Sequence, residues 1–421
     1  MDLNGWDSAY AVNLSYVNAI LSKPANIVSQ FNQKQDAINI AGCFSGWEIV
    51  AGGSGQLLHL ELKIASGTLT GLGNTADLAK VSAKFEVNLS FLPTDLPNKT
   101  KLVLNLKSVG KEDEPSKPGV IKPLNGSVID PNGELSFAQK SILLPMLAQF
   151  LVDNDDNITF AFANVNAVSP DKSSSWLAPT SCAYNYYKTG NGQLFLVVFA
   201  VTNNKSPSGL KLEVDSNLVS GTGNAYYGIS QAMFLEHVVL PSMTKVYPGN
   251  KQDAFSFDAK NNAIINKKHI SLPGKKSGAI TYYPIITSLK ITLSASKIKT
   301  VASGSCDLKM GMSMTFSVTS NCSSSFDGSS GKLTIKKDAH PSTSHDAHIP
   351  WYDYLMGPIP DLIMAIVVPI VADGIASGLD ASINTSFCEI GPLLLDWPGM
   401  THFEIAGGEL NAGFQMFGNV S

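Results

Sequence analysis

The segment Leu362-Ile-Met-Ala-Ile-Val-Val-Pro-Ile-Val-Ala372 contains no polar side chain, and the rest of the chain is interpreted around it. It lies within residues 354–383, a stretch that predicts a helix of about five turns. Pro358 and Pro360 precede the apolar run, and Asp361 supplies the carboxylate that is favoured in a first helical turn. A helix that is apolar on every side must be surrounded by other groups. We therefore expect a central, buried helix here.

The end of this stretch is amphipathic, because Asp373, Ser377 and Asp380 recur on one helical face. The apolar run before Asp373 is shorter than the roughly 20 residues that span a bilayer, so we expect no transmembrane segment. Pro369 removes one helical hydrogen bond and predicts a kink. Because residues 366–368 are β-branched, a buried strand that ends at Pro369 is the alternative.

Composition limits the possible functions. The chain has 421 residues, of which 44% are hydrophobic and 15% are charged, and its net charge is -4. All 30 basic residues are lysine, so the chain lacks the planar guanidinium fork that grips phosphate and guanine. These features argue against nucleic-acid binding and against arginine-clamped phosphoryl transfer, and they suit a large apolar core or an apolar cavity.

The cysteines and the start of the chain predict a cytoplasmic protein. The five cysteines are widely spaced and form no close metal-binding pair, so we expect free thiols in a reducing compartment. Pairing of Cys306 with Cys322 across a hairpin stays open at this point. The first residues show no Sec-type signal peptide, so export would use another route.

The periodicity predicts an α+β fold with long antiparallel meanders and a few long apolar helices. Helices are expected over residues 7–31, from the capping box of Ser136 and Gln139 onward, and from Ser230 to Pro248. The favoured organisation is a single elongated unit over 1–421, with two packed modules that meet near 166–180 as the alternative. Strands are expected over 38–49, 57–64, 81–91, 101–109, 158–165, 182–187, 194–202, 263–336, 387–395, 401–406 and 410–417.

Two local clusters could carry chemistry, and each has a plainer interpretation. Three histidines and two aspartates lie between Asp338 and His348, but the segment has neither helical nor strand period and no known zinc spacing. We interpret it as a polar loop and predict no metal site. The glycine cluster 52–55 stands between two alternating segments, which favours a hairpin turn over a phosphate loop. No catalytic motif is present, and nothing favours an enzyme or a cofactor.

The remaining candidate is an apolar lining on the helices. Methionine and branched aliphatic side chains would suit acyl chains, although the same side chains fill ordinary cores, and the pattern alone favours a core. The candidate lining residues are Met146, Leu147, Phe150, Leu240, Met243, Ile363, Met364, Ile366, Val367 and Ile370. We also expect that Ile366→Asp would bury an unpaired charge and so either unfold the protein or empty its apolar tube.

Five groups of short motifs occur in an order that resembles one protein family. They are Gly5-Trp6-Asp7 with Val17-Asn18, Trp47-Glu48-Ile49 with Gly52-Gly53-Ser54, Val239-Leu240-Pro241, Tyr282-Tyr283-Pro284 and Ile349-Pro350-Trp351. The order resembles the clostridial P-forty-seven (P47) proteins, which are encoded in botulinum neurotoxin gene clusters of the OrfX type.

The resemblance implies a TULIP-like fold, in which long apolar helices are wrapped by a strongly curved antiparallel β-sheet. It implies a non-enzymatic accessory role beside a toxin and a lipid or other amphiphile as ligand. The alternative is an interaction component with a closed core and no ligand, which assembles with other toxin-cluster proteins or with the toxin. The resemblance implies no catalytic residue in this chain.

Overall fold

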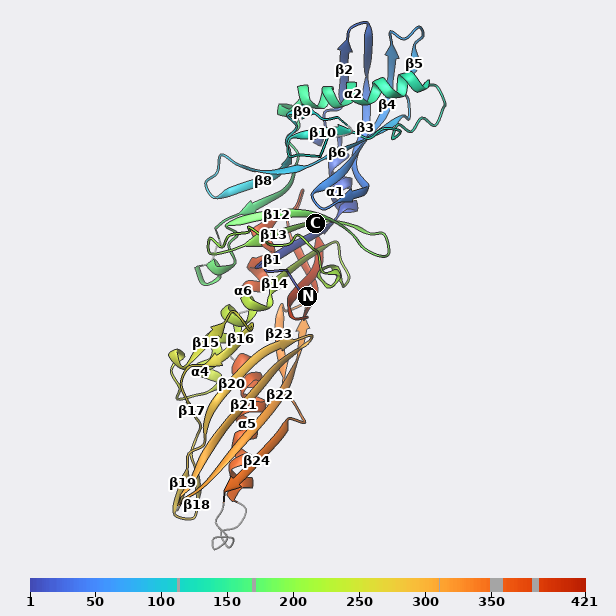
Figure 1. Cartoon of the computed structure of the whole chain (residues 1–421). Coiled ribbons are helices and arrows are strands. Elements are labelled where there is room, and N and C mark those ends of the chain that lie inside the picture. The colour runs from blue at the N-terminus through green and yellow to red at the C-terminus, as the bar shows by residue number, and fades with distance from the viewer. Residues whose placement is uncertain (112–113, 169–171, 310, 349–358, 381–385) are drawn as a thin grey trace. The chain divides into compact units, whose positions relative to one another are not determined.

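The computed structural model describes residues 1–111, 114–168, 172–309, 311–348, 359–380 and 386–421 (Figure 1). The chain divides into two compact units. Unit 1 comprises residues 1–8, 215–391 and 405–418, and unit 2 comprises residues 9–214, 392–404 and 419–421.

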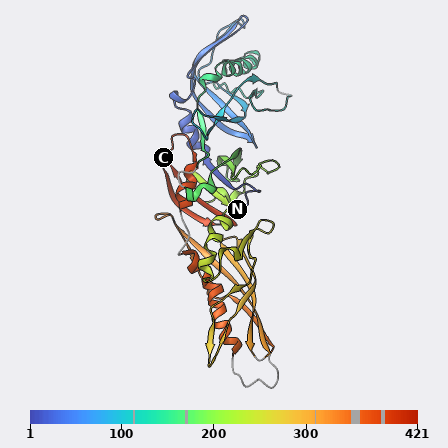
Figure 2. The same ribbon diagram turned by 90° about the vertical axis from the view of Figure 1, so that its left-hand side faces the viewer.

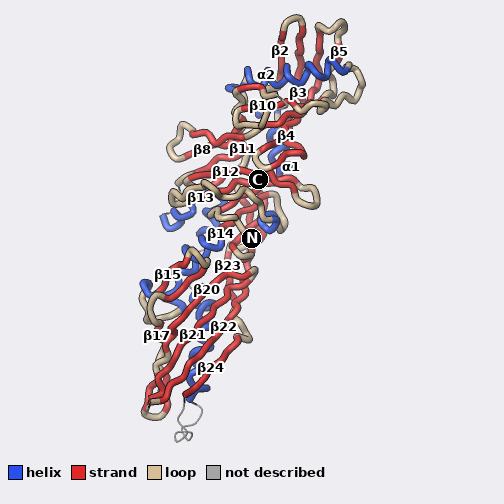
Figure 3. The backbone as a smooth tube through the Cα atoms, in the orientation of Figure 1, coloured by secondary structure: helices blue, strands red, loops and turns tan. Residues whose placement is uncertain are grey.

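Unit 1 is built on an eight-stranded antiparallel sheet with the order β15-β16-β20-β21-β22-β23, to which β17 and β24 add by pairing with β20 and β22. The sheet curls as a half-barrel, and helix α5 (Ile359–Asp380) runs along it (Figures 1 and 3). The strands are β15 (Phe255–Asp258), β16 (Ala263–Asn266), β17 (Ile270–Ser271), β20 (Ile285–Ser294), β21 (Lys297–Lys309), β22 (Met312–Asp327), β23 (Lys332–Lys336) and β24 (Ser342–His348).

The sheet and α5 share a core because the strands alternate. Along β22, Met314, Phe316 and Val318 are buried, while the residues between them are exposed or half-buried. The buried face of α5 repeats every four residues and packs against β21, β22 and β23. Cys322 on β22 donates a hydrogen bond from its thiol to the carbonyl of Ala372 on α5, with a sulfur–oxygen distance of 3.4 Å. The core positions of α5 with no exposed surface are Ile363, Val367, Val371, Ile375 and Leu379.

The expected helix is confirmed in its described part, and the alternative of a strand is wrong, because the helix continues through Pro369. Residues 354–358, with Pro358, and residues 381–383 lie outside the described part of the chain. The expectation that α5 is surrounded is wrong on one side. Leu362 and Ile366 are half-buried and Ala365 is exposed, because the sheet covers only the opposite face of the helix.

The predicted third helix is present but irregular. Ser230 caps it by accepting a hydrogen bond from the backbone N–H of Met233, at 3.3 Å. Pro241 has no N–H to donate, which interrupts the regular α-helical hydrogen bonds. The segment runs through α3 (Gln231–Met233), the π-helix η5 (Phe234–Val239), the 3-10 turn η6 (Leu240–Ser242) and α4 (Met243–Val246). The third segment is therefore not one of the long regular helices that the sequence predicts.

Unit 2 contains a seven-stranded sheet with the order β2-β3-β4-β6-β10-β9, in which β5 also pairs with β4. Helix α2 (Phe137–Asp153) packs on this sheet, and the predicted capping box of Ser136 and Gln139 is confirmed at its start. All pairs in the sheet are antiparallel except β9 with β10. The strands are β2 (Gln30–Gln35), β3 (Ile38–Ser54), β4 (Leu57–Thr70), β5 (Ala76–Asp77), β6 (Ser82–Val87), β9 (Ser108–Val109) and β10 (Val120–Pro123).

The predicted first helix over 7–31 is mostly wrong. Residues Ser8–Asn13 form strand β1, and the helix α1 is only Leu14–Leu21. The Asn13 side chain accepts a hydrogen bond from the backbone N–H of Ser15 at 2.9 Å, which starts the helix there. Residues 8–12 are all buried, so both faces of β1 are covered and the sequence shows no alternation to identify it as a strand.

The remaining strands confirm most of the expected meanders. The predicted strand over 387–395 is wrong, because α6 (Ser386–Ile390) and the 3-10 turn η9 (Gly391–Leu394) occupy it and only β25 (Leu395–Asp396) is extended. The other strands are β7 (Leu89–Pro93), β8 (Lys99–Leu104), β11 (Ala161–Asn166), β12 (Ser181–Lys188), β13 (Leu194–Val201), β14 (Ala225–Ser230), β26 (Phe403–Leu410) and β27 (Gly413–Val420).

The histidine-rich segment is an edge strand and not the expected loop. Strand β24 pairs with β22, and nearly all its residues are exposed, so neither face shows an apolar period. His345 and His348 are three residues apart and therefore point to opposite faces of the strand. Within the described residues, no three His, Cys, Asp or Glu side chains gather as a metal site.

The five cysteines are free. The open question of a Cys306–Cys322 pair is answered by the register of the β21–β22 hairpin. Cys306 lies opposite Met314, whereas Cys322 lies opposite Ile298, so the two thiols sit at different levels of the hairpin.

Candidate functional site: an apolar groove beside helix α5

A groove of about 340 Å³ lies in unit 1 between α5, the end of α4 and the segment that follows β17. Apolar side chains, three prolines among them, form most of its wall, which suits the apolar part of a ligand. The lining residues are Lys245, Val246, Tyr247, Pro248, Ser271, Leu272, Pro273, Pro369, Ile370, Asp373, Gly374 and Ser377.

Two glycines on α5 allow α4 to approach and so define one wall of the groove. A Cβ atom placed on Gly378 would lie 2.8 Å from the Cα and 2.9 Å from the backbone nitrogen of Val246. A Cβ atom placed on Gly374 would lie 3.2 Å from the carbonyl oxygen of Val246. The four-residue spacing places both glycines on one helical face, and helices pack closely where such small residues occur.

The rim of the groove carries charge of both signs. Lys245 is exposed, and Asp373 is half-buried with its carboxylate 3.9 Å from the ammonium of Lys337. The Ser377 hydroxyl donates a hydrogen bond to the carbonyl of Asp373 at 2.8 Å. An apolar wall with polar groups at its edge can hold a molecule that has an apolar body and a polar end.

Tyr247 contributes a buried aromatic residue to the wall. Its ring stacks on Phe255 with the centroids 5.9 Å apart, and the residue is buried. Burial raises the pKa of its hydroxyl, so the group is a neutral phenol at physiological pH. The hydroxyl has no hydrogen-bond partner in the part of the chain that the structure describes.

Of the ten candidate lining residues predicted from sequence, the structure places only Ile370 in the groove wall. Leu240 and Ile366 are half-buried elsewhere in unit 1. Met243, Ile363, Met364 and Val367 are buried in the core of unit 1, and Met146, Leu147 and Phe150 are buried on α2 in unit 2. The structure therefore does not bring the predicted residues together as one lining.

Sequence reasoning missed the segments 245–248 and 271–273, which meet at the groove although about 25 residues separate them. One signal was available, namely the pair of glycines four residues apart on α5. The length argument against a membrane span also needs correction, because Ile359–Leu379 is long and apolar enough to cross a bilayer. Half of that stretch is buried, and a single helix of this length and composition is only weak evidence for a membrane span, so no transmembrane segment is indicated in the described chain.

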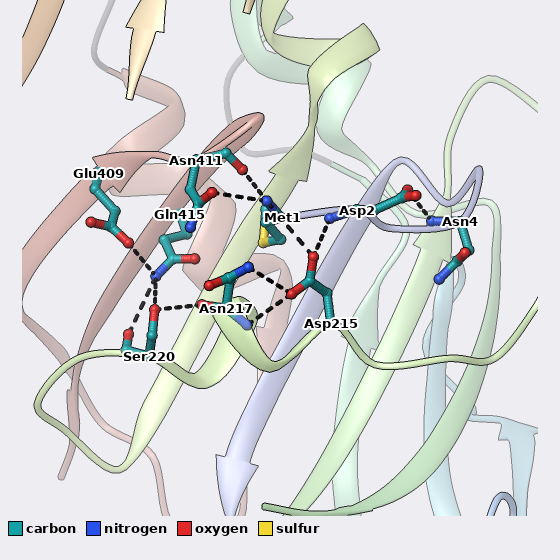
Figure 4. A network of polar contacts seen from close by, with 9 residues as sticks. All are labelled: Met1, Asp2, Asn4, Asp215, Asn217, Ser220, Glu409, Asn411 and Gln415. Atoms are coloured by element: carbon teal, nitrogen blue, oxygen red, sulfur yellow. Dashed lines mark hydrogen bonds and ion pairs between the residues drawn. The ribbon is translucent and has the colours of Figure 1, made fainter. Parts of the chain in front are cut away.

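A polar network elsewhere in unit 1 has a structural role. The Met1 α-ammonium donates to the carbonyl and side-chain oxygens of Asn411 and lies 3.8 Å from the Asp215 carboxylate (Figure 4). Asp215 also accepts hydrogen bonds from the backbone N–H groups of Asp2 at 2.6 Å and Asn217 at 2.9 Å. The network joins the segment before β1 to the start of the turn η4 (Ser216–Val219).

The Asp215 carboxylate predicts a pH dependence of stability. Burial raises its pKa, but the hydrogen bonds from Asn217 and Asp2 and the nearby α-ammonium outweigh burial, and the pKa lies below its ordinary value. The stabilisation is therefore present above the unfolded pKa of about 3.9 and is lost as the pH falls through the lower folded pKa. Thermal melts from pH 6 to pH 3 should show a smaller acid-induced loss for Asp215→Asn than for the native chain. Parallel curves for the two proteins would contradict this assignment.

The fold defines an α+β protein dominated by antiparallel sheets, with one sheet curled as a half-barrel around a single helix (Figure 2). Residues 3–328 match the OrfX-like family, described as Protein OrfX2/OrfX3/P47, and the chain belongs to this family. The resemblance drawn from the sequence motifs is thereby confirmed, although residues 349–351 lie outside the described part of the chain.

Named relatives agree with this assignment. The chain is 24% identical to Protein P47 of Clostridium botulinum (strain Kyoto / Type A2), with 100% of both chains covered. It is 23% identical to Protein OrfX3 of the same organism, over 73% of this chain and 70% of OrfX3.

Solved structures share the fold. P47 from Clostridium botulinum A2 has a TM-score of 0.76 and 24% identity, over 100% of this chain and 98% of that chain. P47 of Clostridium botulinum E1 has a TM-score of 0.70 and 21% identity over 100% of both chains. The family is that of the OrfX and P47 accessory proteins of botulinum neurotoxin gene clusters.

Proposed function

We propose that this chain is a non-enzymatic accessory protein with a TULIP-type fold and that it binds a lipid or other amphiphile in the groove beside α5. The observation that carries the proposal is the uncovered side of this helix. Between Leu362 and Ile370 the outward face is apolar, and the half-barrel sheet leaves it exposed or half-buried. Exposed apolar surface of this kind marks a binding site more often than a scattered apolar residue does.

The energetics suit an acyl chain. Each methylene group that leaves water contributes about 0.8 kcal/mol. The groove volume of 340 Å³ lies at the lower end of the range of small-molecule sites, roughly 300 to 1,000 Å³. Lys245 and Asp373 at the rim can contact a polar head while Ile370 and Pro369 contact the chain.

The second candidate function is a protein–protein interaction component with a closed core. It is favoured by the complete burial of Ile363, Val367 and Met243, as in a filled core. This function requires a partner from the toxin cluster and no ligand. Pull-down with the neighbouring gene products separates the two candidates, because only the second predicts a stable complex with a lipid-free chain.

The test of amphiphile binding uses a variant of the groove. Ile370→Asp places a charge in the wall, where Ile370 is half-buried, so the chain should fold while the groove rejects an acyl chain. We expect affinity for dansyl-undecanoic acid, measured by fluorescence titration, to fall at least about tenfold, which corresponds to about 1.4 kcal/mol.

The matched control is Ile129→Asp, because Ile129 is 48% exposed and lies in unit 2. This variant should bind the probe as the native chain does. Native mass spectrometry of the gently purified chain should also show co-purifying lipid. Absence of probe binding to the native chain, or equal binding by Ile370→Asp, would overturn the proposal.

A further inference from the structure

One segment of unit 1 carries a net positive charge although the chain as a whole is acidic. Residues 245–290 contain eight lysines and two aspartates, which give a formal charge of +6, whereas the whole chain has -4 and the remainder therefore has -10. All eight lysine side chains are exposed. This asymmetry creates a local positive field on a protein that is acidic overall.

This basic segment forms one side of the groove, opposite α5. Lys245 lines the groove, as do residues 271–273, which directly precede the hairpin of β18 (Lys275–Ser277) and β19 (Ile280–Tyr282). The backbone N–H of Leu272 donates to the carbonyl of Pro284 at 3.0 Å and so closes the base of this hairpin. The hairpin therefore follows directly on residues 271–273, which form one wall of the groove. Figure 1 shows β18 and β19 at the end of unit 1 that also contains β24.

The hairpin combines free positive charge with an exposed aromatic ring. Lys275 and Lys276 form no ion pair within the described residues, whereas Lys268 is bound to Asp253 at 2.7 Å. Tyr283 is 65% exposed, and its ring lies so close to Gly274 that a Cβ atom there would approach it to 2.6 Å. Tyrosine is enriched at the interface between a bilayer and water, and lysine can place its apolar stem in the bilayer while its charge stays in water.

We propose that the hairpin 272–284 and Lys245 form a docking surface for an anionic lipid bilayer, from which the groove takes its amphiphile. This inference rests on the proposed function and adds the source of the ligand. The charge complementarity favours an anionic surface over a zwitterionic one. The exposed Tyr283 and the apolar groove beside it favour a bilayer over an acidic protein, which would need no aromatic side chain at this interface and no apolar groove.

The test measures co-sedimentation with vesicles of phosphatidylcholine alone and of phosphatidylcholine with 30% phosphatidylserine. The native chain should bind the anionic vesicles at least about tenfold more tightly, and 1 M salt should abolish the difference because the screening length falls to about 3 Å. Lys275→Gln/Lys276→Gln should reduce binding to anionic vesicles about tenfold or more.

Two controls make the test specific. Lys332→Gln/Lys336→Gln removes the same charge from β23, at the opposite edge of the sheet from β15, and should bind as the native chain does. Tyr283→Ser changes no charge and should still weaken vesicle binding, which an acidic protein or polymer partner would not require.

The outcomes separate this inference from the proposed function. Dansyl-undecanoic acid binding should persist in Lys275→Gln/Lys276→Gln, because the groove wall is unchanged. Equal binding to neutral and anionic vesicles, or equal loss in the β23 control, would overturn the docking surface while leaving the groove intact. Binding to dextran sulfate that depends on the hairpin lysines, without any vesicle binding, would also overturn it.

Discussion

Val367→Asp is expected to unfold unit 1, with a loss of unfolding free energy of about 4 kcal/mol or more. Val367 has 0% exposed surface and lies on the face of α5 that packs against the half-barrel sheet. An aspartate there would have no ion-pair partner and would lose its hydration. Hydrogen exchange of the β21 and β22 amides should show loss of protection, and a circular dichroism melt should show the same loss in the fold.

The neighbouring residue provides the control. Ile366 is half-buried on the outward face, so the charge of Ile366→Asp remains in contact with water, and the expected loss is about 1 kcal/mol or less. This corrects the expectation from sequence that an aspartate at position 366 would be a buried, unpaired charge that unfolds the protein or empties its tube. Equal destabilisation by the two variants would mean that both faces of α5 are covered, which would contradict the uncovered outward face on which the proposed function rests.

Gly378→Val is the second substitution with a large expected effect, about 3 kcal/mol of destabilisation. The first side-chain atom would lie 2.8 Å from the Cα of Val246, which is backbone and cannot rotate away. In an open helix the loss of glycine would instead stabilise the chain. Chemical denaturation should therefore report a lower midpoint, and probe binding should weaken because α4 forms a wall of the groove.

Gly374→Ala is the matched variant. Its added atom would meet the Val246 carbonyl oxygen at 3.2 Å, a close contact that a small shift relieves. The higher helix propensity of alanine offsets this strain, so we expect stability within about 1 kcal/mol of the native chain. A Gly378→Val variant as stable as Gly374→Ala would show that α4 and α5 are not held at this close approach.

The sequence predicts correctly those helices and strands that have one buried face and one face exposed to solvent. Strands β21 and β22 alternate between buried and exposed residues, so period-two alternation identifies them. The capping box of Ser136 and Gln139 gave the start of α2 because two side chains exchange hydrogen bonds with the backbone there.

Elements with two similar faces could not be identified in this way. Residues 8–12 are covered on both faces, whereas nearly all of β24 is exposed on both faces, and in neither case does hydrophobicity alternate. The same reasoning explains the candidate site. The run 362–372 is apolar all round, so nothing in its sequence distinguishes Val367 on the sheet side from Ile366 on the open side.

The groove itself depends on contacts between distant segments. The local sequence around Val246, Leu272 and Ile370 shows no motif that predicts a binding site. The three residues line one groove only because the sheet curls and α4 packs against Gly378. The lysine density of residues 245–290 was readable from the sequence, but its relation to an apolar groove was not.

Photo-crosslinking with a diazirine-bearing fatty acid tests the central claim most directly, because peptide mapping locates the acyl chain. Labelled positions are expected on α5 between residues 369 and 377 and in segments 245–248 and 271–273, with labelling lost in Ile370→Asp. Labelling that is absent from these segments, or that concentrates on Met146, Leu147 and Phe150 of α2, would contradict the account.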